Sequence, residues 1–219
     1  MAERNLPAAR LFGGRPPLYV VFDLALAGDR PLEALARAVL RGGAALLQLR
    51  AKGRPLREQA AAARRLLPLC AEHGVPLLIN DHVDLALAVG AAGAHLGVDD
   101  LPVALARAIM PGGLIGYSPD GVEDARQAGA ADYLGVGPFA ATGTKRDAGA
   151  PIGAAGIGLL AALPVPVVAI GGITRSNAPL ALSAGAAGVA VASAVLAAAD
   201  PELASRQLAD ALARAREAA

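Results

Sequence analysis

The chain has only two lysines among its 20 basic residues, and both lie in short polar segments that follow apolar runs. Lys52 ends the segment QLRAK, and Lys145 lies in TGTKRD. A lysine ammonium is a compact charge with three donors, which suits phosphate oxygens that shift during a reaction. Gln48, Arg50 and Lys52 occupy alternate positions, so a strand running through all three would turn them to one side as a clamp for a polyanion. The alternative is a strand end with solvated charges.

Acidic residues follow the next two apolar runs. Asn80-Asp81 comes after VPLLI, and Asp99-Asp100 comes after GAHLGV. Mg²⁺ commonly takes one or two carboxylates and leaves its other positions to water and phosphate, so Asp81 and Asp100 are candidate metal ligands. Asp and Asn are also preferred helix N-caps, and Asp100 precedes Leu-Pro at an expected helix start. Helix capping is therefore an equal alternative for these carboxylates.

Hydroxyl groups and a lysine follow two later runs. Ser118 comes directly after GLIGY, which places one hydroxyl at the end of a predicted strand. The run ADYLGV leads into a polar, Gly-rich loop that carries Thr142, Thr144 and Lys145. Long loops inside compact domains are usually functional, and this loop predicts anion binding.

The last two apolar runs end in small residues, Gly171-Gly172 and Ala192-Ser193. Backbone N–H groups of the last two loops, with a short helix beginning behind them, are a frequent phosphate seat in barrels. Glycine lets the backbone approach the anion closely. Two anion seats in one protein, one of them with a carboxylate pair, indicate a transferase that uses two phosphorylated substrates and releases diphosphate.

Eight apolar runs position these residues, and they begin at residues 18, 44, 75, 93, 113, 131, 165 and 188. Continuous rather than alternating hydrophobicity is typical of parallel strands covered on both faces. Helices are expected at 31–41, 56–72, 83–89, 101–110, 122–128, 157–163, 177–184 and 201–218. The pattern predicts an α/β fold, a single-domain (β/α)₈ TIM barrel over residues 16–219, after a flexible leader at 1–15. A doubly wound open sheet is the alternative, but FDLALAGD lacks its Gly-rich turn.

Composition excludes several classes of function. A net charge of +1 gives no long-range field for nucleic acid or an anionic membrane, and no apolar stretch is long enough for a membrane span. The start of the chain lacks the apolar region of a secretory signal. Cys70, the single cysteine, is expected to be a core thiol in a reducing cytoplasm, and the three histidines (His73, His82 and His95) are expected to be structural. A homo-oligomer is compatible with the sequence.

Taken in order, these segments resemble the thiamine phosphate synthase family. The resemblance covers residues 18–205 and rests on QLRAK, LLINDHVDLALAVGAAGAHLGVDDLPV, GYS, GPFAATGTKRDA, AIGGIT and GVAVASA. It implies a (β/α)₈ barrel enzyme that joins a hydroxymethylpyrimidine diphosphate to a thiazole phosphate, with Mg²⁺ present, and releases diphosphate.

The resemblance also implies a role for each matching residue. The pyrimidine diphosphate would be held by Gln48, Arg50, Lys52, Asn80, Ser118 and Lys145, and among these Arg50, Lys52, Lys145 and Ser118 would be catalytic. The thiazole phosphate would be held by Thr142, Thr144, Gly172, Ala192 and Ser193. Asp81 and Asp100 would hold Mg²⁺.

Two segments depart from the family pattern. The family commonly has Gln-Glu before the metal aspartate, where this chain has Val98-Asp99. It commonly has Ser-Thr-His after the fifth strand, where this chain has Ser118-Pro119-Asp120, so an imidazole that a related thiazole tautomerase needs is missing. The alternatives are a tautomerase-like paralogue, a Schiff-base aldolase that uses one of the rare lysines, and a non-catalytic barrel that binds a phosphorylated metabolite.

Overall fold

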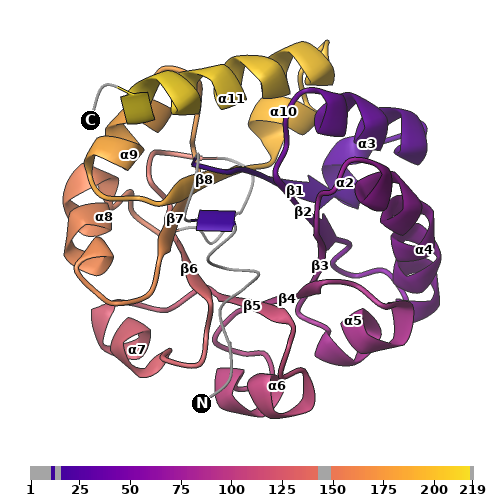
Figure 1. Cartoon of the computed structure of the whole chain (residues 1–219), viewed down its shortest axis with the longest axis horizontal. Coiled ribbons are helices and arrows are strands. Elements are labelled where there is room, and N and C mark those ends of the chain that lie inside the picture. Colours follow the sequence, from indigo (N-terminus) through magenta and orange to yellow (C-terminus); the bar gives the residue numbers. More distant parts are fainter. Residues whose placement is uncertain (1–10, 13–15, 143–148, 218–219) are drawn as a thin grey trace.

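The computed structural model describes residues 11–12, 16–142 and 149–217. Within these ranges, parallel strands close into a barrel in chain order, with β8 paired back to β1 (Figure 1). The strands are β1 Leu18–Asp23, β2 Leu46–Arg50, β3 Leu77–Asn80, β4 Gly93–Leu96, β5 Leu114–Tyr117, β6 Tyr133–Val136, β7 Val167–Ile170 and β8 Gly188–Val191. The closed order confirms the predicted (β/α)₈ TIM barrel and excludes the doubly wound open sheet.

Helices form the outer ring (Figure 1). They are α2 Leu24–Ala27, α3 Leu32–Arg41, α4 Leu56–Glu72, α5 Val83–Val89, α6 Val103–Ile109, α7 Val122–Gln127, α8 Gly153–Ala161, α9 Ala178–Ser183, α10 Ser193–Leu196 and α11 Pro201–Glu217. The sequence placed the start of α8 too late and missed α2, because a four-residue helix is too short to show a helical period. None of the helices in the described ranges is long and apolar enough to cross a membrane.

Side chains on the two faces of the strands fill two separate cores. Outward residues such as Val20, Leu49 and Ile79 pack under the helices. Inward residues such as Tyr19 and Tyr133 form a second cluster inside the barrel. Burial on both faces is the reason that the strands read as continuous apolar runs. The lone cysteine, on α4, is a buried free thiol as predicted, and burial raises its pKa to about 12.

Two inward glycines leave room for large side chains in the barrel. A Cβ on Gly116 would lie 2.2 Å from the Tyr133 ring and 2.4 Å from His95 Nδ1. A Cβ on Gly135 would lie 2.9 Å from the His95 ring. The absence of side chains on β5 and β6 at these positions therefore allows an imidazole and a phenol to occupy the interior.

Part of the expected leader contacts the barrel. Leu11 and Phe12 are described, and both pack against the inner cluster. The rings of Phe12 and Tyr133 have their centroids 5.5 Å apart. The remaining residues of that segment, 1–10 and 13–15, lie outside the described residues.

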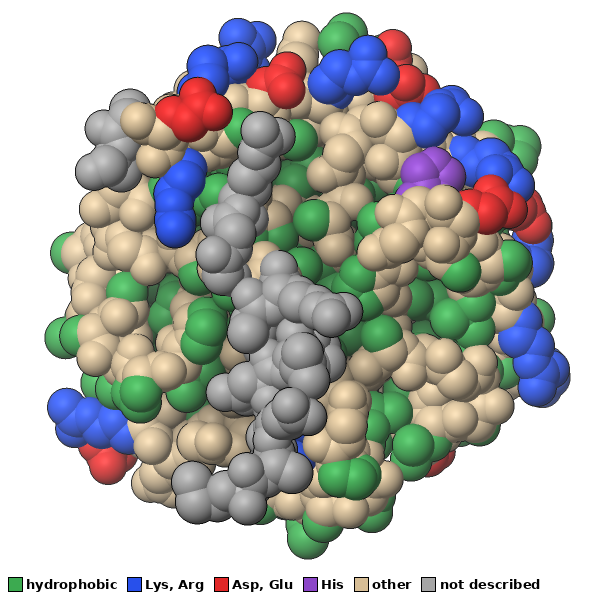
Figure 2. All heavy atoms as spheres, viewed as in Figure 1, with side chains coloured by type: hydrophobic (Ala, Val, Ile, Leu, Met, Phe, Trp, Pro, Cys, Tyr) green, Lys and Arg blue, Asp and Glu red, His purple; other side chains and the backbone are tan. Residues whose placement is uncertain are grey.

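Charged side chains are unevenly distributed around the ring. They gather over α3 and α4 and are sparse over α8 (Figure 2). Residues 149–199 contain a single charged side chain, Arg175. Side-chain charge near β7 and β8 is therefore limited in this stretch to Arg175, in the segment between β7 and α9, whereas the β2 to β4 side offers several charges.

Candidate active site

The predicted site residues that the structure describes lie at one rim of the barrel, which we call the mouth. Most lie at, or after, the carboxyl end of a strand: Arg50 on β2, Asn80 and Asp81 at β3, Asp100 after β4, Ser118 after β5, Thr142 after β6, Gly172 after β7, and Ala192 and Ser193 after β8. Gln48 lies in the middle of β2, below the mouth. Because all strands are parallel, these ends share a single rim. Thr144 and Lys145 lie outside the described residues.

Asp100 lies close enough to Asp81 to perturb the pKa of Asp81. Burial raises the pKa of Asp81, the nearby Asp100 carboxylate raises it further, and the Lys52 charge opposes both effects. Asp81 has a left-handed backbone with φ of 66°, and its N–H donates to the His95 carbonyl at 2.9 Å. Asp100 accepts a hydrogen bond from the Gly97 N–H at 2.7 Å. The loops after β3 and β4 thus bring two carboxylates together.

Neither carboxylate caps a helix, so the capping alternative is wrong. The N-cap of α5 is His82 and the N-cap of α6 is Pro102, and neither helix has a side-chain cap. The two expected caps fail because each helix begins after the aspartate that was expected to cap it. Both aspartates line one cavity.

The paired carboxylates fit a magnesium ion. Two like charges held together are favourable when a divalent cation neutralises them. Among the described residues, no group of three or more His, Cys, Asp or Glu side chains is arranged to hold a metal ion, so zinc-like ligation has no support there. Mg²⁺ suits the donor set, since it takes one or two carboxylates and completes its shell with water and phosphate.

Lys52 lies near Asp81, but it is not part of strand β2 as the alternating pattern predicted. β2 ends at Arg50, so the alternating clamp does not extend to Lys52, which lies in the following turn. Lys52 Nζ is 3.6 Å from Asp81 Oδ2, and the side chain is 59% exposed. An exposed pair of this kind contributes about 1 kcal/mol at most. The lysine therefore remains able to exchange this partner for a bound anion.

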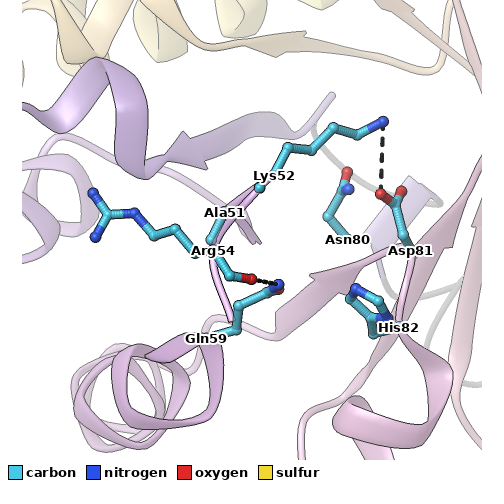
Figure 3. A pocket seen from close by; sticks show the side chains of 8 residues that line it. Ala51, Lys52, Arg54, Gln59, Asn80, Asp81 and His82 are labelled. Atoms are coloured by element: carbon cyan, nitrogen blue, oxygen red, sulfur yellow. Dashed lines mark hydrogen bonds and ion pairs between the residues drawn. The ribbon is translucent and has the colours of Figure 1, made fainter. Parts of the chain in front are cut away.

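A cavity of about 260 Å³ opens beside this pair. Figure 3 shows Lys52 and Asp81 turned toward one another over Asn80, while Arg54 points away. Gln59 donates to the Arg54 carbonyl at 2.9 Å, which ties the turn after β2 to α4. The cavity is thus bounded by the ends of β2 and β3 and carries both signs of charge.

Arg50 lies next to an acidic residue that the sequence analysis did not single out. Its guanidinium pairs with the carboxylate of Asp23, the last residue of β1. The two residues are neighbours in the β1–β2 register. The segment FDLALAGD indicated only a missing Gly-rich turn, and the pairing depends on strand register, which the sequence does not display.

Hydrogen bonds join six side chains across the interior below the mouth. They are, in order, Ser118, His95, Tyr133, Tyr19, Gln48 and Asn80. Tyr133 donates to Tyr19 at 3.0 Å, Tyr19 donates to Gln48, and the Gln48 amide donates to Asn80 at 2.6 Å. One row of polar groups therefore connects five strands with the segment that follows β5.

These donor directions fix the proton on His95. The Tyr133 hydroxyl gives its only hydrogen to Tyr19, so its oxygen accepts from His95 Nδ1 at 2.9 Å. Nε2 then accepts from the Ser118 hydroxyl at 2.8 Å. Burial lowers the pKa of His95 to about 4, so the ring is neutral near pH 7. The row ends with the Asn80 amide N–H groups, which are left as donors at the mouth.

The loop after β7 has the geometry of a close backbone approach. Gly172 has φ of 66°, and a Cβ there would lie 2.5 Å from the Ala140 carbonyl oxygen in the segment after β6. Asn177 donates to the Gly172 carbonyl at 2.9 Å and accepts from the Thr174 N–H at 2.7 Å. The short helix predicted behind the last two loops is α10, which begins at Ser193 after β8. The loops after β6 and β7 therefore meet through backbone groups, and the Ala140 N–H donates to the Gly171 carbonyl at 3.0 Å.

A family model and three known proteins that resemble this chain have the same kind of description. A family model described as thiamine monophosphate synthase matches residues 18–195. A thiamine-phosphate synthase of Herpetosiphon aurantiacus is 53% identical over 193 residues, 87% of this chain and 93% of that protein. One of Moorella thermoacetica is 46% identical over 203 residues, 91% and 97% of the two chains. The structure of a thiamine phosphate pyrophosphorylase from Pyrococcus furiosus matches with a TM-score of 0.84 and 36% identity, covering 95% of this chain and 98% of that one.

Proposed function

The chain belongs to the thiamine monophosphate synthase family, and we propose that it is a transferase that makes thiamine phosphate. Its substrates would be 4-amino-2-methyl-5-(diphosphooxymethyl)pyrimidine and a thiazole phosphate, with diphosphate as the second product. One observation carries the proposal: charged groups at β2 to β4 and a close backbone approach at β7 lie at the same rim of the barrel, and we assign them to two anion seats of different chemistry. One seat has full charges at β2 to β4, and the other has backbone groups at β7 and β8.

The charged seat suits the diphosphate of the pyrimidine substrate. Arg50 and Lys52 supply cations from β2 and the turn after it, and Asn80 supplies amide donors. Lys145, a rare lysine of the loop after β6, is assigned to the same diphosphate by sequence. Cations placed where charge grows on a leaving group lower the barrier, at about 3 kcal/mol, or about a hundredfold in rate, for each such contact.

The proposed reaction is a dissociative substitution. The bond between the pyrimidine methylene carbon and the diphosphate oxygen breaks, and its electron pair leaves with the diphosphate. The thiazole nitrogen then donates its lone pair to the methylene carbon and forms the new C–N bond. No protein nucleophile or strong base is required, so the work of this chain is positioning and charge stabilisation.

Asp81 and Asp100 would bind the metal, and the hydrogen-bonded row would fix the positions of the side chains at the base of the site. Mg²⁺ bound by Asp81 and Asp100 would offset negative charge on the diphosphate oxygens. Ser118 and Asn80 form the two ends of the row, so their positions depend on the neutral His95 ring. A neutral, fully bonded ring suits a positioning role and does not supply a proton at neutral pH.

The neutral seat suits the thiazole phosphate. Gly172, Ala192 and Ser193 would supply backbone groups there, and Thr142 and Thr144 of the loop after β6 are assigned to the same phosphate by sequence. A phosphate held by backbone N–H groups leaves the cations of the other seat to the diphosphate. This division would let the two substrates bind side by side without competing for one pocket.

Cytoplasmic location is part of the proposal and is supported by the single buried, free cysteine. The substrates are the partners that the proposed reaction requires. Homo-oligomer formation stays a prediction.

The test is to mix both substrates with the purified chain, with and without Mg²⁺, and to measure thiamine phosphate and diphosphate by chromatography. We expect both products in equal amounts, with Mg²⁺ required. Binding of the thiazole phosphate without release of diphosphate would instead identify a non-catalytic metabolite-binding barrel. Isomerisation of the thiazole alone would identify a tautomerase.

A further inference from the structure

Asp23 is the last residue of β1, and it is buried, with 4% of its surface exposed. Its Oδ2 accepts from Nη1 of Arg50, and its Oδ1 accepts from the Ala25 N–H at 2.9 Å. One carboxylate thus serves two partners, a site cation and the first turn of α2. We propose that Asp23 is a positioning residue for the reaction, which aims the Arg50 guanidinium at the diphosphate seat; this inference rests on the proposed function.

Helix capping alone does not explain a carboxylate at this position. A neutral Ser or Asn caps a helix as well as Asp does. A buried carboxylate is costly unless its oxygens are paired. Arg50 supplies that pairing, so the charge on Asp23 is explained by the guanidinium and the cap uses the second oxygen.

The contact leaves most of the guanidinium available to a ligand. Arg50 is 26% exposed, and in the described part of the chain only its Nη1 has a hydrogen-bond partner. A guanidinium carries five N–H donors in a rigid fork. Holding one corner of the fork from β1 fixes the direction of the others. It also removes part of the side-chain entropy that anion binding would otherwise cost.

A second effect of Asp23 has the opposite sign, which makes the inference testable. The carboxylate partly neutralises Arg50 and would repel a bound diphosphate. If neutralisation dominated, removing the carboxylate would tighten diphosphate binding. If positioning dominates, as we infer, removing it weakens diphosphate binding and slows turnover even though the seat becomes more positive.

The experiment compares Asp23→Ser with Asp29→Asn. Serine retains a cap for α2 and removes the carboxylate from Arg50. Asp29 is on the same segment and exposed, and in the described residues it has no hydrogen bond or ion pair, so its variant is a charge-matched control. We expect Asp23→Ser to raise KM for the pyrimidine diphosphate about tenfold and to leave KM for the thiazole phosphate unchanged. Unchanged kinetics, or tighter diphosphate binding, would overturn the inference.

A double-mutant cycle tests whether Asp23 acts through Arg50. Once Arg50→Ala has been made, adding Asp23→Ser should change kcat/KM by less than about twofold. Full additivity of the two losses would show that Asp23 acts independently of Arg50 and would refute the positioning role. If Asp23→Ser does not fold by circular dichroism, the isosteric Asp23→Asn takes its place in the same measurements.

Binding of inorganic diphosphate with Mg²⁺, measured by calorimetry, separates this inference from the proposed function. A wild-type chain that makes no thiamine phosphate would refute the function. Weaker diphosphate binding by Asp23→Ser than by wild type would still support positioning of Arg50. Equal binding by both proteins would refute the positioning role whatever the activity.

Discussion

Replacing Gly172 by alanine tests whether the loop after β7 is a phosphate seat that depends on close backbone approach. Gly172 has φ of 66°, and a Cβ there would lie 2.5 Å from the Ala140 carbonyl oxygen and 2.7 Å from the Ala141 carbonyl oxygen. Both neighbours are backbone atoms, which cannot move aside as the end of a flexible side chain can. The variant must therefore shift the β6 or β7 loop.

Gly74→Ala is a matched control, because it measures the cost of a left-handed alanine without a steric clash. Its φ of 65° is nearly the same, but a Cβ there meets nothing within 4 Å. The left-handed conformation costs an alanine about 1 kcal/mol. Gly74→Ala should therefore lower the free energy of unfolding by about 1 kcal/mol. Gly172→Ala should lower it by about 3 kcal/mol, because overpacking adds about 2 kcal/mol.

Urea denaturation and steady-state kinetics measure the two consequences. We expect Gly172→Ala to raise KM for the thiazole phosphate at least about tenfold and to leave KM for the pyrimidine diphosphate within about twofold of wild type. Gly74→Ala should leave both KM values unchanged. Equal destabilisation by the two variants would refute the steric argument, and an unchanged KM for the thiazole phosphate in Gly172→Ala would move the seat elsewhere.

Further substitutions and a titration test the other parts of the site. Asp100→Asn should fold normally and lose about a hundredfold in kcat, with more Mg²⁺ needed for half-maximal rate; wild-type turnover would remove Asp100 from the metal site. Ser193→Asp should raise KM for the thiazole phosphate by like-charge repulsion, and an unchanged value would contradict the assignment of that loop. Burial raises the pKa of Tyr19 and Tyr133, and it raises that of Tyr117 to about 12. The folded protein thus keeps protons that the unfolded chain loses near pH 10, so this stabilisation is present below pH 10 and is lost as pH rises above it. Tyrosinate absorbance at 295 nm should stay low at pH 10.5 until the protein unfolds, and a normal titration in the folded protein would show that these rings are not buried.

The architecture could be read from the sequence because parallel strands of a barrel are covered on both faces. Each strand is then a continuous apolar run, and the first polar residues after the run mark the mouth. This reasoning placed Asp81, Ser118 and Gly172 correctly at one rim. It failed for Lys52, because alternation along a strand is informative only as far as the strand extends, and β2 ends at Arg50.

Register explains the pairing of Arg50 that the sequence did not reveal. Asp23 and Arg50 are 27 residues apart in the chain and become neighbours only when β1 and β2 align Asp23 with Arg50. A shift of one residue would turn every side chain of one strand to its other face. The apolar runs determine which segments become strands, but they do not display which residues of two strands lie opposite one another.

The interior row was missed for a different reason. Tyr19, His95 and Tyr133 lie inside apolar runs, where an aromatic or imidazole side chain is usually part of the core. They form a polar row because Gly116 and Gly135 leave space for the rings. Two glycines in short strands would otherwise indicate only weak strand propensity. In a closed barrel, glycines that face inward opposite large polar side chains therefore indicate an interior filled by hydrogen-bonded polar groups. Here that interior supports both Ser118 and Asn80.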